Sequence, residues 1–131
     1  MKFTTALLLT ALLGFALPLY APWWSFAISS LLVALVIPQK PWRAFLAGFA
    51  GLFLLWGVQS AWLDSANSGL LSSKMAAMFG VGSGIVLILV TAFLGALISG
   101  GAALAGSFVV QPKRVRATVV EEQEAAETTA E

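Results

Sequence analysis

Residues 75–110, MAAMFGVGSGIVLILVTAFLGALISGGAALAGSFVV, indicate most clearly how this chain folds. It holds 36 residues without a charged side chain, and glycine and alanine are frequent in it. A helix that is apolar on every side is stable in lipid or when buried, but not at a surface in contact with water. An apolar run of about 18 residues or more is typical of a transmembrane helix. The stretch therefore predicts a helix that spans a membrane.

Small residues recur along this stretch at steps of three and four, which is the spacing of one helix face. In lipid, close approach of helices through small residues replaces the hydrophobic driving force. We therefore expect this "small stripe" to face another helix, while bulky residues such as Leu89 and Phe93 face lipid. The small stripe consists of Gly80, Gly84, Ile88, Thr91, Gly95, Ser99, Ala102 and Gly106.

The composition also indicates an integral membrane protein. Hydrophobic residues make up 60% and charged residues 10% of the 131, whereas ordinary globular domains carry roughly 25% charged residues. The chain has no cysteine and no histidine, so disulfides and thiolate metal sites are excluded and the commonest general base is missing. Glycines 80, 82 and 84 lack the preceding strand that a phosphate-binding loop needs. We expect no catalytic site, no metal, no cofactor and no nucleic-acid partner.

Three further apolar segments accompany the first, so we predict an all-α bundle of four transmembrane helices over residues 1–110. Pro18 and Pro22 divide the uncharged N-terminal region, because proline interrupts helical hydrogen bonding. The expected spans are about residues 3–19, 23–37, 44–63 and 75–99. The last is expected to kink or stop at Gly100–Gly101, since 36 helical residues would reach ~54 Å and exceed the hydrocarbon core of ~30 Å.

The first segment has a second interpretation as a secretory signal. Lys2 would form a short basic region ahead of an apolar core, as in signal peptides. The candidate cleavage site Leu19-Tyr20-Ala21 has a large leucine where a small residue is preferred, and Pro22 would obstruct the peptidase. We expect residues 1–21 to be retained, and cleavage stays open as the alternative.

The charged residues predict the orientation of the chain. With four spans, Lys2, Lys40, Arg43 and the three basic residues of the tail share one side, and only Lys74 lies on the other. Because cytoplasmic loops carry an excess of Lys and Arg, both termini are expected in the cytoplasm, in a plasma membrane of the bacterial inner-membrane type. The tail, residues 111–131, is expected to be disordered, since a short isolated helix is unstable in water.

Polar groups that are not needed for solubility gather where the third and fourth spans meet. Gln59 lies about one turn inside the third span, where a helix–helix hydrogen bond is its expected role. Asp64, Asn67 and Lys74 belong to the connection DSANSGLLSSK, which is expected to be a polar loop on the outer side. This loop is a candidate contact surface, because loops held by rigid helices often carry binding groups.

These observations favour a non-enzymatic accessory or assembly subunit that acts through helix packing. Its expected partners are the lipid bilayer and either another membrane protein or further copies of itself. The alternative is an oligomeric channel or carrier for a small solute. Ionisable groups within the spans would favour the alternative, and the expected spans contain none.

Overall fold

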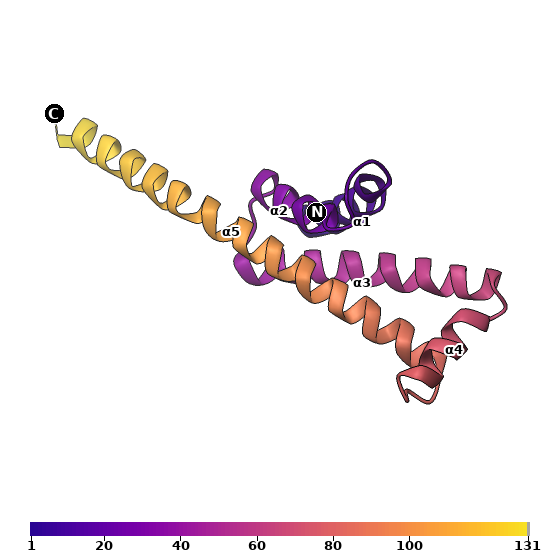
Figure 1. Ribbon diagram of the computed structural model, residues 1–131. Helices are drawn as coiled ribbons and strands as arrows, with labels where there is room; N and C mark the ends of the chain where they lie inside the picture. The colour runs from indigo at the N-terminus through magenta and orange to yellow at the C-terminus, as the bar shows by residue number, and fades with distance from the viewer. Residues whose placement is uncertain (131) are drawn as a thin grey trace.

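The computed structural model describes residues 1–130, with only the backbone described at 112–115. This part of the chain contains five α-helices and no strand (Figure 1). The helices are α1 (Lys2–Tyr20), α2 (Ser25–Val36), α3 (Pro41–Ala66), α4 (Leu70–Met78) and α5 (Gly84–Ala130). The predicted all-α class is confirmed.

Three of these helices, α1, α3 and α5, are long and apolar enough to cross a membrane. The helix α2 is apolar but has only 12 residues. Its length of ~18 Å falls short of a hydrocarbon core of ~30 Å. The structure therefore supports three spanning helices by length, where the sequence predicted four.

The helices α3 and α5 form a long antiparallel pair, and α1 and α2 lie against it (Figure 1). The antiparallel direction follows from two contacts, because Gly48 packs near Ala103 and Trp56 packs near Gly95. The side-chain amide of Gln39 donates a hydrogen bond of 3.1 Å to the carbonyl oxygen of Lys2. The helices α1 and α3 therefore start at the same end of the molecule. We call this the Lys2 end, and the opposite end the α4 end.

The core where α2, α3 and α5 meet is built from serine, glycine and alanine. The hydroxyls of Ser30 and Ser99 lie 2.6 Å apart, and Ser99 donates a 2.9 Å hydrogen bond to the carbonyl of Gly48. Glycine is required at position 48, because an added Cβ would lie 2.9 Å from the Cβ of Ala103 and 3.0 Å from the backbone oxygen of Ser99. Close backbone approach is therefore what holds α3 against α5.

A Schellman turn ends α3. Ser68 and Gly69 have positive φ angles of 54° and 66°. Gly69 N donates to Asp64 O at 2.9 Å, and Ser68 N donates to Ser65 O at 3.2 Å. This is the hydrogen-bond pattern of a Schellman motif. The polar loop predicted for residues 64–74 is therefore wrong, since only a tight turn separates α3 from α4.

A second Schellman turn corrects the predicted fourth span. Gly80 has a φ of 68°, Val81 N donates to Ala76 O, and Gly80 N donates to Ala77 O. These bonds end α4, and α5 begins only at Gly84. Residues 75–99 are therefore not one helix, and Gly80 ends a helix instead of packing within one.

The C-terminal region differs from the prediction in two ways. The helix α5 runs through Gly100–Gly101 without a break and continues to Ala130, so it has 47 residues. The tail is thus helical and projects beyond the other helices (Figure 1). A tail that extends an existing helix avoids the cost of nucleation, and its Glu, Gln and Ala residues are good helix formers. The side chains of Lys113 and Arg114, two of the three basic residues of the tail, lie outside the described residues.

Candidate functional site

The four polar residues predicted as one contact surface lie near the α4 end but do not form a cluster. Gln59 and Asp64 belong to α3, Asn67 follows its last turn, and Lys74 belongs to α4. Asp64 is half-buried and the other three are exposed. Within the described residues, no ion pair joins Asp64 to Lys74. Gln59 lines one groove of the molecule and Asp64 lines others.

The groove that contains Gln59 lies between α1 and the final turns of α3. It has a volume of about 220 Å³ and is lined by Phe15, Gln59, Trp62, Leu63 and Ala66. Three of these five side chains are hydrocarbon, Trp62 carries one N–H donor, and Gln59 supplies the hydrogen-bond acceptor of the lining. We call it the Gln59 groove.

The amide of Gln59 has no hydrogen-bond partner among the described residues. A primary amide offers two N–H donors and a carbonyl acceptor with two lone pairs. The expected hydrogen bond from Gln59 to another helix of this chain is therefore not made. Both halves of the amide remain available to a group outside the chain.

Asp64 lies where α3 and α5 separate near the α4 end. Two grooves of about 240 and 380 Å³ flank this gap, and Asp64 lines both. Their remaining lining is mostly apolar and includes Leu63 in one groove and Ile85 in the other, with Ile88 in both. Asp64 is their only ionisable side chain, so neither groove contains a pair of groups for acid–base chemistry.

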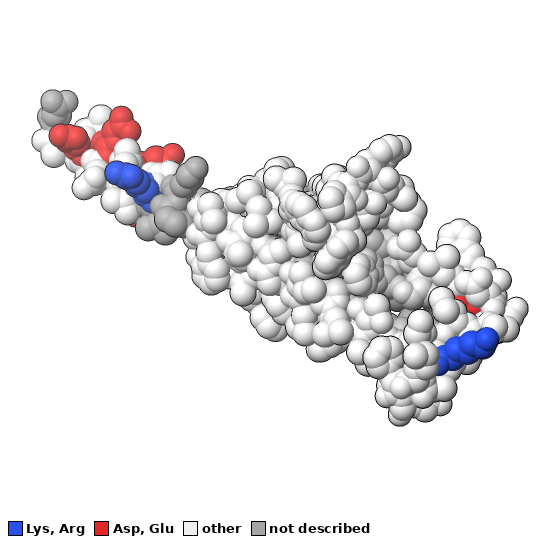
Figure 2. Space-filling model, in the orientation of Figure 1, with Lys and Arg blue, Asp and Glu red and all other residues white. Residues whose placement is uncertain are grey.

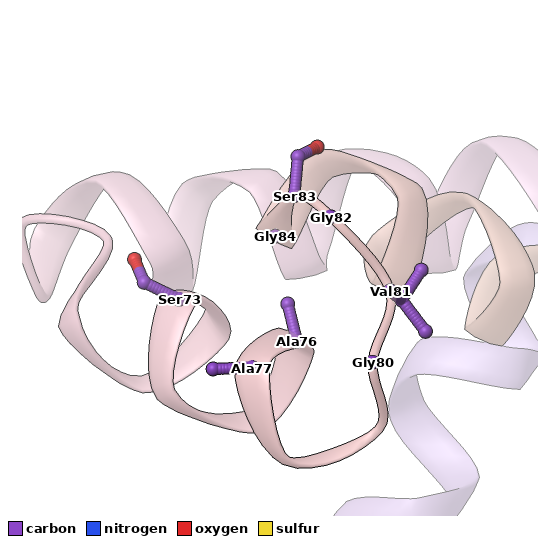
Figure 3. Close-up of a pocket in the computed structure, with 8 residues that line it drawn as sticks. All are labelled: Ser73, Ala76, Ala77, Gly80, Val81, Gly82, Ser83 and Gly84. Atoms are coloured by element: carbon purple, nitrogen blue, oxygen red, sulfur yellow. The ribbon is translucent and has the colours of Figure 1, made fainter.

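A hollow of about 570 Å³ lies between α4 and the start of α5 (Figure 3). Its walls are small residues, among them Ser73, Ala76, Ala77 and Ser83. The hydroxyl of Ser73 already donates to the carbonyl of Gly69. A helix precedes this hollow where a phosphate-binding loop would have a strand. The hollow thus has neither the charge nor the topology of a nucleotide site.

The predicted small stripe is only partly the packing face of α5. Gly95, Ser99 and Gly106 are buried, while Gly84, Ile88 and Ala102 are half-buried. Thr91 is exposed, and Gly80 lies outside the helix. The actual face advances by alternating steps of four and three, and its buried members are Ala92, Gly95, Ala96, Ser99, Gly100, Ala103, Gly106 and Ser107.

The sequence prediction missed Ala92 and Ala103 because it stepped by three from Ile88 to Thr91 and from Ser99 to Ala102, where a step of four reaches the buried residue. It missed Ala96 because it followed a single line of residues, whereas the buried face also includes the residue next to Gly95. Helices that supercoil around each other repeat their packing residues every 3.5 positions. This period gives residues 92, 96, 99, 103 and 106, all of which are buried. The prediction also missed Ser30, which belongs to a different span and joins Ser99 only in three dimensions. Among the described residues, no group of three or more carboxylate, histidine or cysteine side chains is placed to hold a metal ion.

Comparison with known proteins gives no relative from which a role can be carried over. No family model, no curated protein and no solved structure matches this chain. The fold and the grooves thus define a small all-helical chain with three helices that can span a membrane.

Proposed function

We propose that this chain is a multi-pass membrane protein that works as a non-enzymatic accessory or assembly subunit. Large apolar side chains are exposed along all three long helices, including Leu8, Leu12, Leu54, Val58 and Leu94. On the face shown in Figure 2, the charged side chains gather at the two extremities of the molecule, and the surface between them shows none. An uncharged surface of this kind is what contact with the hydrocarbon core of a bilayer requires.

We propose that the chain lies in a plasma membrane of the bacterial inner-membrane type. In this orientation the Lys2 end is on the cytoplasmic side. The hydrogen bond from Gln39 to Lys2 brings the chain back to its starting end before α3 begins. Lys2, Lys40 and Arg43 therefore lie at one end, and Lys74 lies at the other. This asymmetry favours a cytoplasmic Lys2 end by the positive-inside rule. The C-terminal part of α5 leaves the bundle at the same end, so both termini are cytoplasmic in this proposal. The proposal therefore requires that the segment containing the short helix α2 returns across the membrane between α1 and α3, because three crossings would leave the termini on opposite sides.

The observation that carries the subunit role is the unpaired amide of Gln59 in an apolar groove. Gln59 lies seven residues before the end of α3 at Ala66, so it is ~10 Å along the helix from that end. In lipid, no water is present to satisfy such a group. Interhelical hydrogen bonds from Gln side chains are one of the forces that associate membrane helices. The Gln59 groove is thus suited to a helix that presents a hydrogen-bonding side chain between Phe15 and Trp62.

The occupant of the groove is either a helix of a different membrane protein or a helix from a second copy of this chain. In a symmetric dimer, each Gln59 would pair with the other, because an amide is both donor and acceptor. The channel or carrier alternative has no observation of its own in the described residues. It would need a pore between several copies.

The test is recovery of the partner from membranes in mild detergent, read by mass spectrometry with quantified stoichiometry. Three variants are compared at equal membrane abundance: Gln59→Leu, the double change Asp64→Ala with Asn67→Ala, and a deletion of residues 118–131. We expect Gln59→Leu alone to lose the stoichiometric partner. If the tail deletion loses the partner while Gln59→Leu retains it, the contact is made by the tail and the proposal is wrong.

The same preparation separates the subunit role from the alternative function. A purified homo-oligomer that moves a small solute across liposomes would support the channel or carrier. A stoichiometric partner that depends on Gln59, with no solute movement by the purified chain alone, supports the accessory subunit.

A further inference from the structure

A small cavity lies among four helices near the Lys2 end. Its lining includes three polar side chains, Thr10, Ser30 and Gln39, together with alanines such as Ala47. The space open to the centre of a water molecule is about 10 Å³. A buried water needs roughly 10–15 Å³ measured in this way, together with two to four polar partners. The cavity therefore has room for one water molecule.

Gln39 places an acceptor without a partner at this cavity. Its Nε2 group donates to the carbonyl oxygen of Lys2, which only accepts. The amide therefore cannot be flipped, because a flip would bring two acceptors together. The other half of the amide, Oε1, is buried and makes no hydrogen bond among the described residues. A buried acceptor without a donor has lost its hydrogen bonds to water with nothing in exchange, so it destabilises the folded chain.

Thr10 and Ser30 supply the remaining polar atoms of the lining. Thr10 is 1% exposed, and no hydrogen bond of its hydroxyl is found among the described residues. Ser99 uses its one proton for the carbonyl of Gly48. The Oγ atom of Ser30 lies 2.6 Å from Oγ of Ser99 and 3.1 Å from the carbonyl oxygen of Phe26. Ser30 donates its one proton to these two acceptors, which leaves a lone pair on Ser30 free to accept.

From this arrangement we infer a binding site for a single structural water molecule. The water donates one proton to Oε1 of Gln39 and the other to Oγ of Ser30, and it accepts the hydroxyl proton of Thr10. These three bonds satisfy the buried acceptor and the threonine hydroxyl together. Because Thr10 belongs to α1 and Gln39 to the segment between α2 and α3, the water ties the first helix to the rest of the bundle.

The unfolding equilibrium of the full chain in mixed micelles tests this inference through a double-mutant cycle. The variants are Thr10→Val, which keeps the shape of the side chain, Gln39→Met, and the two together. With a bound water, Thr10→Val should raise the unfolding equilibrium constant about fivefold, the effect of losing one hydrogen bond. The same change in the Gln39→Met background should raise it less than twofold, because the water has already lost a partner.

Ser25 provides the matched control. Its hydroxyl is also buried without a partner, but it does not line this cavity. Ser25→Ala should leave the unfolding constant unchanged or lower it. The inference is overturned if Thr10→Val has less than a twofold effect in the wild-type background, or an equal effect in both backgrounds. A crystal structure from lipidic mesophase at 2 Å or better gives the second readout, and a cavity without water density also overturns it.

Discussion

Replacing Gly48 by alanine adds one methyl group where the backbones of α3 and α5 lie close together. The new Cβ would lie 2.9 Å from Ala103 Cβ and 3.0 Å from the backbone oxygen of Ser99. A backbone atom cannot turn aside as a flexible side chain can, so the two helices must separate. Overpacking of this kind costs about 1–3 kcal/mol. Separation also lengthens the hydrogen bond from Ser99 to the carbonyl of residue 48, and such a bond between membrane helices contributes about 0.6 kcal/mol.

Gly57→Ala on the same helix is the matched control. A Cβ added at Gly57 meets nothing within 4 Å. Both variants gain up to about 1 kcal/mol in helix propensity, so this term cancels between them. We expect Gly57→Ala to be neutral or stabilising, and Gly48→Ala to be less stable than Gly57→Ala by about 2 kcal/mol, from the sum of overpacking and the weakened bond.

Reversible unfolding in mixed micelles, followed by far-UV circular dichroism, measures this difference. Both variants are measured at the same detergent composition, because the stability of a membrane protein depends on the detergent. Equal unfolding midpoints for Gly48→Ala and Gly57→Ala would refute the reasoning that backbone contact at residue 48 sets the distance between α3 and α5.

Three further predictions follow from the helix positions. Gly95→Leu should lower the stability of the bundle strongly, because a Cβ there would lie 2.7 Å from the indole ring of Trp56. Leu89→Ala should lower it only mildly, because Leu89 is 50% exposed. Equal losses of stability in the two variants would contradict this prediction. A cysteine at Ser68 should react with an impermeant maleimide on intact cells and one at Ala117 only after lysis, and the reverse pattern would invert the proposed orientation. Deleting residues 117–130 should remove helical circular dichroism in proportion to their number, and an unchanged total signal would show that the tail is not helical in solution.

The sequence predicted the helical class and the positions of α1 and α3 closely. Long uncharged runs leave few alternatives to a helix, and Pro18 and Pro22 marked the region where α1 ends. Pro41 begins α3. Proline suits this position because the first N–H groups of a helix have no hydrogen-bond partner within the helix. These features depend on residues close together in the chain, so they can be read without knowing the fold.

The break before α5 could have been predicted from a local signal that was misinterpreted. Gly80 fits the periodicity of a packing face, but it also fits the C′ position of a Schellman turn. The hydrogen bond from Val81 to Ala76 shows that the second role holds. Periodicity alone does not separate these roles, because glycine serves both.

Other features depend on contacts that no local pattern contains. The pairing of Ser30 with Ser99 joins residues 69 positions apart. The absence of a partner for Gln59 among the described residues becomes visible only when every helix is in place. The helical tail depends on α5 continuing from the bundle, which supplies the helix nucleus that an isolated tail would lack.

Site-specific photo-cross-linking in cells shows whether a protein partner contacts the Gln59 groove. A photoreactive amino acid is placed at Phe15, which lines the groove, and in a separate strain at Leu94, which is exposed on α5 and lies outside the groove. We expect one discrete protein adduct from position 15 and only lipid labelling from position 94. A discrete protein adduct from position 94 together with lipid labelling alone from position 15 would contradict it.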